Sequence, residues 1–295
     1  MQEHQYTYSF IIPHHNSPEL LNRCLDSIPQ REDIQIIVVD DNSAEDKRPC
    51  IKRNDVEVIY IDAEHTKGAG RARNYGLKAA KGKWLLFADC DDYYNDGFLE
   101  VLDKYKDENN EILYFNFSYF DTETGKNIPD NKVQLYIKTF NGQKDAADYI
   151  RYCNKTPWSK MFDNSFVKHN KMYFEEVANG NDILFSIWAG YKCANYRVIN
   201  DRIYNYNKYS NSIVTHKKTP TEYMCVLIHV LQHNHFLNFI GHKEWQMSLF
   251  HCIATYIKNY PLSYSIKLII ILILKNRDIL SRKKEWIEII TRKEI

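Results

Sequence analysis

The sequence predicts an α/β protein built on a doubly wound and mostly parallel central sheet. Two continuous apolar runs, at residues 34–39 and 84–88, have the composition of parallel strands that are covered on both faces. Such runs alternate with segments of helical periodicity over the first third of the chain, an order typical of doubly wound sheets. Ligands of these sheets bind at the carboxyl ends of the strands, so we expect a site in the loops that follow them.

The other elements of this region follow one another closely. Residues 7–13 predict a strand that ends at a proline, and Ser17 and Pro18 are residue types favoured at a helix N-cap and first helical position. Residues 56–61 predict a further strand. The small side chains of residues 69–80 predict a helix.

The middle of the chain has a different pattern. Residues 112–120 and 133–138 alternate apolar and polar side chains around a turn-rich connection, and this predicts an antiparallel excursion. The remaining elements of this part are two helices, at residues 143–152 and around 182–191, and two short strands, at residues 196–199 and 202–206.

Residues 219–295 predict consecutive helices that follow a first domain at residues 1–218. Residues 262–274 form an apolar run with basic flanks, shorter than the roughly 20 residues that a membrane span needs. Peripheral contact with a membrane and packing in a core or an oligomer are both open for this run.

Bulk composition narrows the function classes. A formal net charge of +1 gives no global electrostatic reason to expect a nucleic acid partner. The seven cysteines are scattered singly, which fits reduced thiols better than a disulfide framework or a structural zinc site. The N-terminal residues lack the pattern of a signal peptide. We therefore expect a cytoplasmic protein, or one on the inner face of the plasma membrane if the apolar run contacts lipid.

The strongest candidate for chemistry is the acidic run from Asp89 to Asp92, directly after the predicted strand at residues 84–88. Carboxylates this close repel one another unless a cation lies among them. Oxygen ligands with open coordination positions suit Mg²⁺ or Mn²⁺ holding a diphosphate. The structural alternative is a solvated turn in which Asp92 caps the next helix.

Two more polar segments follow predicted strands. Asp40 and Asp41 are placed where acidic side chains accept hydrogen bonds from a base N–H or from ribose hydroxyls. Pro13, His15 and Asn16 end the first strand, where a histidine can stack on a base or hydrogen-bond to it. An Asx-turn and an ordinary loop are the structural alternatives.

Residues 68–76 carry Arg71 and Arg73 near a predicted helix N-terminus, a favourable place for phosphate. The glycine spacing is not that of the dinucleotide fingerprint, which disfavours a Rossmann dehydrogenase. The glycines also fit a purely structural role in close helix–sheet packing.

Taken in order, these segments resemble the family 2 glycosyltransferases with the GT-A fold, which include many bacterial capsule, lipopolysaccharide and cell-wall enzymes. The matching segments are Pro-x-x-Asn, Val-Asp-Asp-x-Ser, Ala-Arg-Asn-x-Gly and Asp-x-Asp-Asp, at residues 13–16, 39–43, 72–76 and 89–92. The resemblance is dense over the first third of the chain. It implies a GT-A nucleotide-diphospho-sugar transferase fold with a helical C-terminal extension, and a metal-dependent, hexosyltransferase-like activity.

The resemblance also implies roles for single residues. Asp40 or Asp41 contacts the nucleoside, expected to be uridine, and Asp91 is the principal metal ligand, with Asp89 near the ribose or the metal. The other donor-binding residues that it implies are Pro13, His15, Asn16, Arg73, Trp158 and Lys160.

Asp182 is the catalytic base that the resemblance implies. The family usually carries a Glu-Asp pair at this point, whereas this chain has Asn181 before Asp182. Capping of the helix that begins there is the structural alternative for Asp182. Residues 204–206 and 210–212 resemble the loop that closes over the donor, and His216 is a candidate contact to the diphosphate.

The predicted function is inverting transfer of a sugar from a nucleotide-sugar, expected to be a UDP-sugar, to the hydroxyl of a saccharide or lipid-linked saccharide. Asp182 would take the acceptor proton, while Mn²⁺ or Mg²⁺ would neutralise the departing diphosphate. The alternative hypothesis is a scaffold of a polysaccharide assembly complex that binds a nucleotide-sugar without transferring it. Asn181 and the C-terminal helices motivate that alternative.

Overall fold

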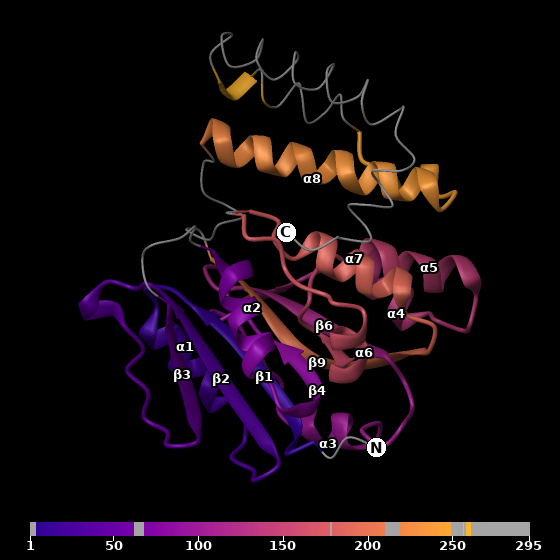
Figure 1. Ribbon diagram of the computed structural model, residues 1–295. Coiled ribbons are helices and arrows are strands. Elements are labelled where there is room, and N and C mark those ends of the chain that lie inside the picture. Colours follow the sequence, from indigo (N-terminus) through magenta and orange to yellow (C-terminus); the bar gives the residue numbers. More distant parts are fainter. Residues whose placement is uncertain are drawn as a thin grey trace. The chain divides into compact units, whose positions relative to one another are not determined.

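The computed structural model in Figure 1 describes residues 4–61, 68–177, 179–209, 219–248, 256 and 258–260. The chain divides into two compact units, Met1–His216 and Lys217–Ile295. Each unit has its own buried cluster of apolar side chains.

The first part of the sheet is parallel. Strands β1 (Tyr6–His14), β2 (Ile34–Asp41), β3 (Val56–Ile61) and β4 (Gly82–Phe87) lie in the order β3-β2-β1-β4. Every residue of β2 is buried, as the continuous apolar run predicts for a strand covered on both faces. The predicted α/β class and doubly wound sheet are confirmed in this part, and all four strands run in the same direction.

The sheet continues beyond β4 as a mixed sheet. Strand β8 (Lys160–Asp163) runs antiparallel to both β4 and β6 (Ile112–Asp121), and β9 (Tyr196–Lys208) runs parallel to β6. Two short strands, β5 (Tyr93–Tyr94) and β7 (Lys126–Ile128), pair antiparallel with β9 and β6.

Two predictions for this middle part were wrong. Residues 133–138 lie in helix α4 (Lys132–Lys138), whose start is fixed by a reciprocal capping box between Asn131 and Gln134. The short run alternates, but it also has helical spacing, and that spacing buries Ile137 against the sheet. The two short strands are a single strand, β9, whose pairing with β6 shifts register beside Asn116.

Helices cover both faces of the sheet. Helices α1 (Pro18–Asp26) and α3 (Phe98–Asp103) share one apolar cluster with alternate residues of the strands, such as Phe10 and Ile12. The other face is covered by α4 and by four further helices, α2 (Ala69–Ala79), α5 (Lys144–Cys153), α6 (Asn164–His169) and α7 (Ile183–Lys192), whose apolar side chains share a cluster with Ile11. The two-residue period of the strands produces this division.

The second unit contains helix α8 (Pro220–Phe239), which begins with a capping box between Thr219 and Glu222. A short 3₁₀ helix, η2 (Lys243–Trp245), follows it. The apolar run at residues 262–274 lies outside the described residues. Within the described part of the chain, no helix combines the length and hydropathy needed to cross a bilayer.

Candidate functional site

The carboxyl ends of β1, β2 and β4 lie at one edge of the sheet because these strands are parallel neighbours. The polar segments that follow them are therefore brought together, as predicted. Burial raises the pKa of the Cys90 thiol, and the backbone N–H of His15 opposes this by hydrogen bonding to the sulfur. Through this bond the loop after β1 contacts the acidic turn after β4.

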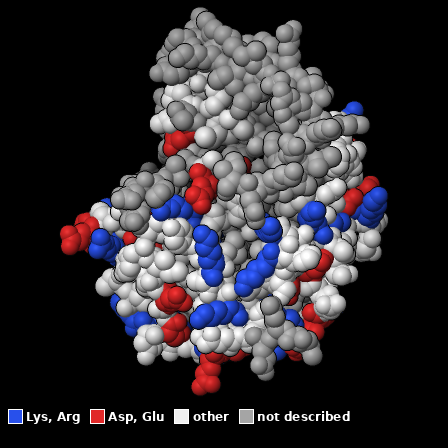
Figure 2. All heavy atoms as spheres, viewed as in Figure 1, with Lys and Arg blue, Asp and Glu red and all other residues white. Residues whose placement is uncertain are grey.

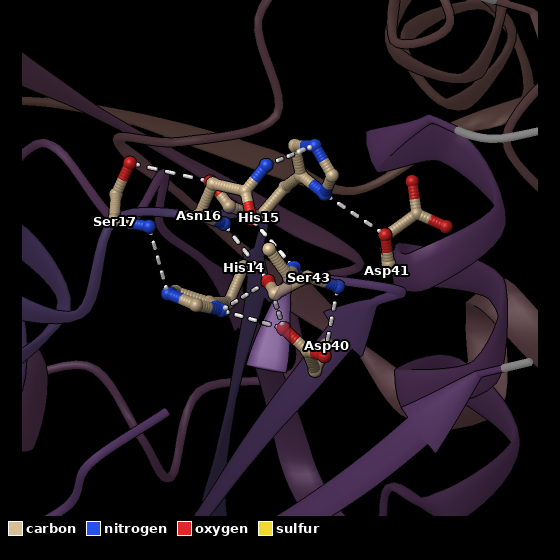
Figure 3. A network of polar contacts seen from close by, with 8 residues as sticks. His14, His15, Asn16, Ser17, Asp40, Asp41 and Ser43 are labelled. Atoms are coloured by element: carbon tan, nitrogen blue, oxygen red, sulfur yellow. Dashed lines mark hydrogen bonds and ion pairs between the residues drawn. The ribbon is translucent and has the colours of Figure 1, made fainter. Parts of the chain in front are cut away.

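A buried network organises the loops after β1 and β2 (Figure 3). The backbone N–H of Ser17 donates to Nε2 of His14 (3.2 Å), so Nε2 carries no proton and Nδ1–H donates to Oδ1 of Asp40 (2.7 Å). Asp40 also accepts from the hydroxyl (2.5 Å) and the backbone N–H (3.2 Å) of Ser43. Only 1% of Asp40 is exposed, so its carboxylate is engaged by the protein itself.

Asp41 lies in a different environment. Its Oδ2 accepts from the backbone N–H of Gly68 (2.6 Å), while Oδ1 is buried and has no partner among the described residues. A buried carboxylate oxygen without a donor is costly, and a ligand N–H or O–H would satisfy it.

His15 lies beside Asp41 with an exposed imidazole ring. The ring donates from Nδ1 to the carbonyl oxygen of Asp41 (2.9 Å) and accepts at Nε2 from the amide of Asn16 (2.8 Å). Asn16 also accepts the backbone N–H of Ala44 (2.8 Å) and adopts the left-handed conformation, with φ of 54°. Pro13 is buried within β1 opposite Val39, so it contributes to the site through the strand.

The acidic turn is held by its last residue. Asp92 accepts the hydroxyl of Tyr204 (2.9 Å) and the backbone N–H of Asn207 (2.7 Å), both from β9. It caps no helix, since α3 begins after Gly97. Arg23 of α1 donates to the carbonyl oxygen of Asp91. Asp92 is therefore a buried anchor of the turn.

Asp89 and Asp91 are the two carboxylates of the turn that remain partly exposed. Burial, together with the charge of Asp89, raises the pKa of Asp91 to about 6. Two neighbouring carboxylates with this electrostatic stress suit a divalent cation that also takes oxygens from a ligand. No group of three or more His, Cys, Asp or Glu side chains in the described part of the chain could hold a metal ion.

Arg73 connects the acidic turn to the segment before α7. It donates to Oδ1 of Asn181 (2.7 Å) and to Oδ1 of Asp89 (2.5 Å), and only 4% of it is exposed. Gly70 allows this approach, because a Cβ there would lie 2.0 Å from the carbonyl oxygen of Glu175. The glycines of α2 thus serve close packing and, through it, the placement of Arg73.

Asp182 occupies the N-cap position of α7, but its side chain makes no capping hydrogen bond. The structural alternative for this residue is therefore not realised. Burial raises the pKa of Asp182, while the positive charge of Arg73 opposes the rise and the charge of Asp89 adds to it. A carboxylate with a raised pKa beside charged side chains has the character of a general base.

Trp158 and Lys160 are almost fully buried. The Trp158 ring stacks on the Tyr204 ring, with centroids 5.1 Å apart. Lys160 donates from Nζ to the carbonyl oxygen of Asn154 (2.7 Å), and burial lowers its pKa to about 7. Residues 204–206 lie in β9, and residues 210–212 and His216 lie outside the described residues.

Sequence reasoning missed the partners that fix the acidic turn: Tyr204, Asn207 and Arg23. The first two are more than a hundred positions from Asp92, and no local pattern marks their contact with it. Only the pairing of β5 with β9 brings them there.

The fold and this site define a nucleotide-diphospho-sugar transferase architecture, and comparison with known proteins agrees. The family model described as "Glycosyl transferase family 2" matches residues 9–170. The chain belongs to this family.

Several curated proteins are similar to the chain. "Putative glycosyltransferase EpsH" of Bacillus subtilis (strain 168) is 24% identical over 217 residues, which cover 70% of this chain and 62% of the relative. "Poly(ribitol-phosphate) beta-glucosyltransferase" of Bacillus spizizenii is 29% identical over 208 residues, which cover 67% and 32%. The chain thus spans from about a third to three fifths of the length of these relatives.

Among solved structures, that of S. aureus TarS 1–349 in complex with UDP-GlcNAc superimposes with a TM-score of 0.57 at 18% identity. The superposition covers 87% of this chain and 82% of TarS 1–349. This likeness confirms the predicted GT-A-like α/β fold.

Proposed function

We propose that the protein is an inverting glycosyltransferase that moves a sugar from a UDP-sugar to an acceptor hydroxyl. The observation that carries the proposal is the position of Asp182, an uncapped carboxylate of raised pKa, beside the Arg73–Asp89 pair. Family membership supports the reaction class, and the UDP-GlcNAc complex of TarS supports the donor class.

In the proposed donor complex, Oδ1 of Asp41 accepts an N–H of the base, and the exposed His15 ring lies against it. Asn16 holds that ring through its amide and ties the two loops together. Asp40 and Pro13 act on the donor indirectly. Asp40 fixes the loop after β2 through Ser43, and Pro13 belongs to strand β1. Arg73 keeps Asp89 oriented, and its Nε, which has no partner among the described residues, is a further donor for the diphosphate.

Asp91, with Asp89, is the proposed ligand pair for Mn²⁺ or Mg²⁺. Two carboxylates leave most coordination positions of such an ion to phosphate oxygens and water. A bound cation would neutralise the charge that builds on the departing diphosphate. The raised pKa of Asp91 means that the site binds cations best above about pH 6, where this carboxylate is ionised.

Asp182 is the proposed base. The acceptor oxygen forms a bond to the anomeric carbon as the bond from that carbon to the diphosphate oxygen breaks, and the acceptor proton passes to the carboxylate. Asn181 contacts Arg73 with a neutral amide, whereas a carboxylate at this position would compete with Asp89 for the guanidinium group. The charge of Lys160 favours ionised Asp182, and the buried Trp158 ring stacks on Tyr204.

We expect Asp182→Asn to lower transfer at least about a hundredfold, since a positioned general base contributes 10²–10⁴-fold. UDP binding in the presence of Mn²⁺, measured by calorimetry, is expected to stay unchanged because the proposed partner of Asp182 is the acceptor hydroxyl. A matched control is Asp163→Asn, at the N-cap of α6 on another part of the chain, which should leave transfer intact. Undiminished transfer by Asp182→Asn would remove it as the base.

The acceptor that we propose is a saccharide or lipid-linked saccharide of a cell-surface polymer, met at the inner face of the membrane. Screening UDP- and GDP-sugars for metal-dependent hydrolysis identifies the donor. A wild-type protein that binds UDP without hydrolysing or transferring any donor would instead be a nucleotide-sugar-binding scaffold.

A further inference from the structure

Lys160 is a lysine whose charge lies inside the protein. Lysine side chains normally keep their ammonium group in water, as the Lys and Arg side chains visible on the face in Figure 2 do. Lys160, the first residue of β8, is 1% exposed, and its Nζ lies 5.5 Å from the centroid of the Tyr114 ring. Its hydrogen bond to the carbonyl oxygen of Asn154 (2.7 Å) engages one of its N–H donors with a neutral partner. An enclosed ammonium group of this kind is costly unless a negative charge lies near it.

The backbone in front of Lys160 is held in a strained conformation. Ser159 is buried and adopts the left-handed region, with φ of 56°, which costs free energy for a residue that has a Cβ. Its carbonyl oxygen accepts the backbone N–H of Phe115 in β6 (3.0 Å), and Lys160 pairs with Tyr114 of the same strand. The packing on both sides therefore fixes the direction of the lysine side chain.

Lys160 lies on the face of β8 that packs against α7. Side chains two positions apart share a face of a strand, and the ring of Phe162 lies 5.5 Å from that of Phe185 in α7. Met161, which points the other way, belongs to the apolar cluster of the opposite face. Phe185 follows Asp182 by less than one helical turn. The contact of the two phenylalanines therefore brings the start of β8 close to the start of α7.

The two elements also run in the same direction. Strand β8 is antiparallel to β6, whereas β9 is parallel to β6. A short link joins the end of α7 to the start of β9, so α7 runs back against β9 and hence in the direction of β8. Lys160 and Asp182 thus lie on the same side of the Phe162–Phe185 contact. Burial lowers the pKa of Lys160 to about 7 and raises the pKa of Asp182, and each charge opposes the shift of the other group.

Other charged groups face Asp182 as well. Besides burial, the charge of Arg73 from α2 lowers the pKa of Asp182, and that of Asp89 from the acidic turn raises it. Lys155, in the loop before β8, has a pKa that burial lowers and that the charge of Asp182 helps to restore. Arg73 divides its hydrogen bonds between Asn181 and Asp89, whereas Lys160 forms no ion pair with another carboxylate of the described residues. The charge of Lys160 is therefore left for Asp182.

We propose that Lys160 is a positioning residue for transfer, the buried counter-ion that keeps the Asp182 carboxylate ionised, instead of the donor contact that the resemblance implies. This inference rests on the proposed role of Asp182 as the base. The acceptor proton passes to Asp182 and the negative charge moves to the departing diphosphate, so Lys160 itself takes up and releases no proton. The lysine acts by widening the pH range in which the base is ionised.

The first test is the pH profile of transfer by the full chain. Lys160→Met removes the charge at similar length, and Lys160→Gln also keeps an N–H donor for Asn154. Without the ammonium group the pKa of Asp182 rises, so the acid limb of kcat should move up by about one pH unit, with about a tenfold loss on that limb. Variant and wild type should converge above about pH 7, where Lys160 is neutral. UDP binding with Mn²⁺, measured by calorimetry, should equal that of the wild type.

Lys83→Met is the matched control. Lys83 also donates to a backbone carbonyl oxygen, that of Lys106 (2.6 Å), and its Nζ lies over an aromatic ring, that of Trp84 (5.4 Å). It belongs to β4 at the opposite end of β8 from Lys160, so its removal should leave the pH profile unchanged. A loss of transfer that is uniform over pH in the Lys160 variants, or an unmoved acid limb, would overturn the proposal. Weaker UDP binding would assign Lys160 to the donor.

A second test needs no donor. In the Asp182→Asn background the ammonium group of Lys160 has lost its counter-charge, so Lys160→Met should destabilise the protein less there than in the wild type. Chemical unfolding of the four proteins at about pH 6.5, where Lys160 carries its charge, measures this difference. Equal destabilisation in both backgrounds would refute the charge pair. A wild type that transfers no sugar would refute the proposed function, and the unfolding measurement would still confirm or refute the pair.

Discussion

Asp40 and Asp41 are neighbours in sequence, yet their carboxylates face different partners. Asp40 accepts from His14 and Ser43 inside the protein, whereas Oδ1 of Asp41 is buried without a donor among the described residues. The alternation of side chains at the end of a strand places consecutive residues on opposite faces. One aspartate therefore builds the loop, and the other is the one that we propose for the donor.

We expect Asp41→Ala to weaken UDP binding about 10- to 100-fold, the range for loss of one hydrogen bond to a charged group. Asp40→Ala is the matched comparison. It should lower the free energy of unfolding by about 1–3 kcal/mol, because it leaves the Nδ1–H of His14 and the Ser43 donors unsatisfied. Calorimetry and thermal unfolding measure the two effects, and a larger binding loss for Asp40→Ala would reverse the assignment.

Asp91 makes the stability of the protein depend on pH. Its pKa is raised from 3.8 to about 6 in the fold, so the folded state keeps a proton that the unfolded chain loses. The resulting stabilisation amounts to up to about 3 kcal/mol. It is fully present below pH 3.8 and is lost as the pH rises from 3.8 through about 6. Without divalent cation, wild type should unfold at a lower temperature than Asp91→Asn at pH 7.5, and the difference should shrink as the pH falls below about 6 and vanish only below about pH 3.8. Added Mn²⁺ should stabilise only the wild type.

The residue types of the site were predictable from the sequence, but the structural role of each aspartate was not. The sequence placed Asp40, Asp41 and the acidic run after strands, and their convergence follows from parallel pairing alone. Three contacts decide which aspartate anchors a loop and which keeps a carboxylate oxygen without a partner. They are made by His14, Gly68 and Asn207, and they arise only from the packed fold.

At the scale of elements, α2 packs closely against its neighbours because two of its positions are glycines. A Cβ at Gly70 would overlap the carbonyl oxygen of Glu175, and one at Gly76 would lie 2.4 Å from Cγ2 of Ile11. The first contact supports the segment that carries Asn181, and the second lies in the core beneath the sheet.

Gly70→Ala should therefore reduce transfer more than it reduces stability, because the segment must move and Arg73 loses Asn181. We expect at least about a tenfold loss of activity, since small displacements at a catalytic group are costly. Gly76→Ala is the control, with a stability loss of about 1–3 kcal/mol from overpacking and little specific effect on transfer. Activity per folded molecule distinguishes the two, and parallel losses in both variants would contradict this account.

Elements with strong periodicity were the easiest to predict. The strand at residues 56–61 has the predicted bounds, whereas residues 133–138 form a helix instead of a strand. The spacing of residues 133–138 fits a strand and a helix alike, and the Asn131–Gln134 capping box decided it in favour of the helix.

At the scale of the whole molecule, the residues of the candidate site all lie in the first compact unit, whereas helix α8 belongs to the second. Removal of residues 261–295, which include the apolar run, should release the protein from the membrane fraction of cells while leaving donor hydrolysis intact. Fractionation at low salt measures this, and an unchanged distribution would assign the run to packing.

The anchoring of Asp92 on β9 has a consequence for laboratory evolution of the protein. Because this carboxylate is enclosed by Tyr204 and Asn207, libraries that vary it will mostly yield unfolded members. Asp89 and Asp91 belong to the same turn but are partly exposed, so they tolerate replacement without unravelling it. Variation of the proposed cation site should therefore randomise those two positions and hold the third constant.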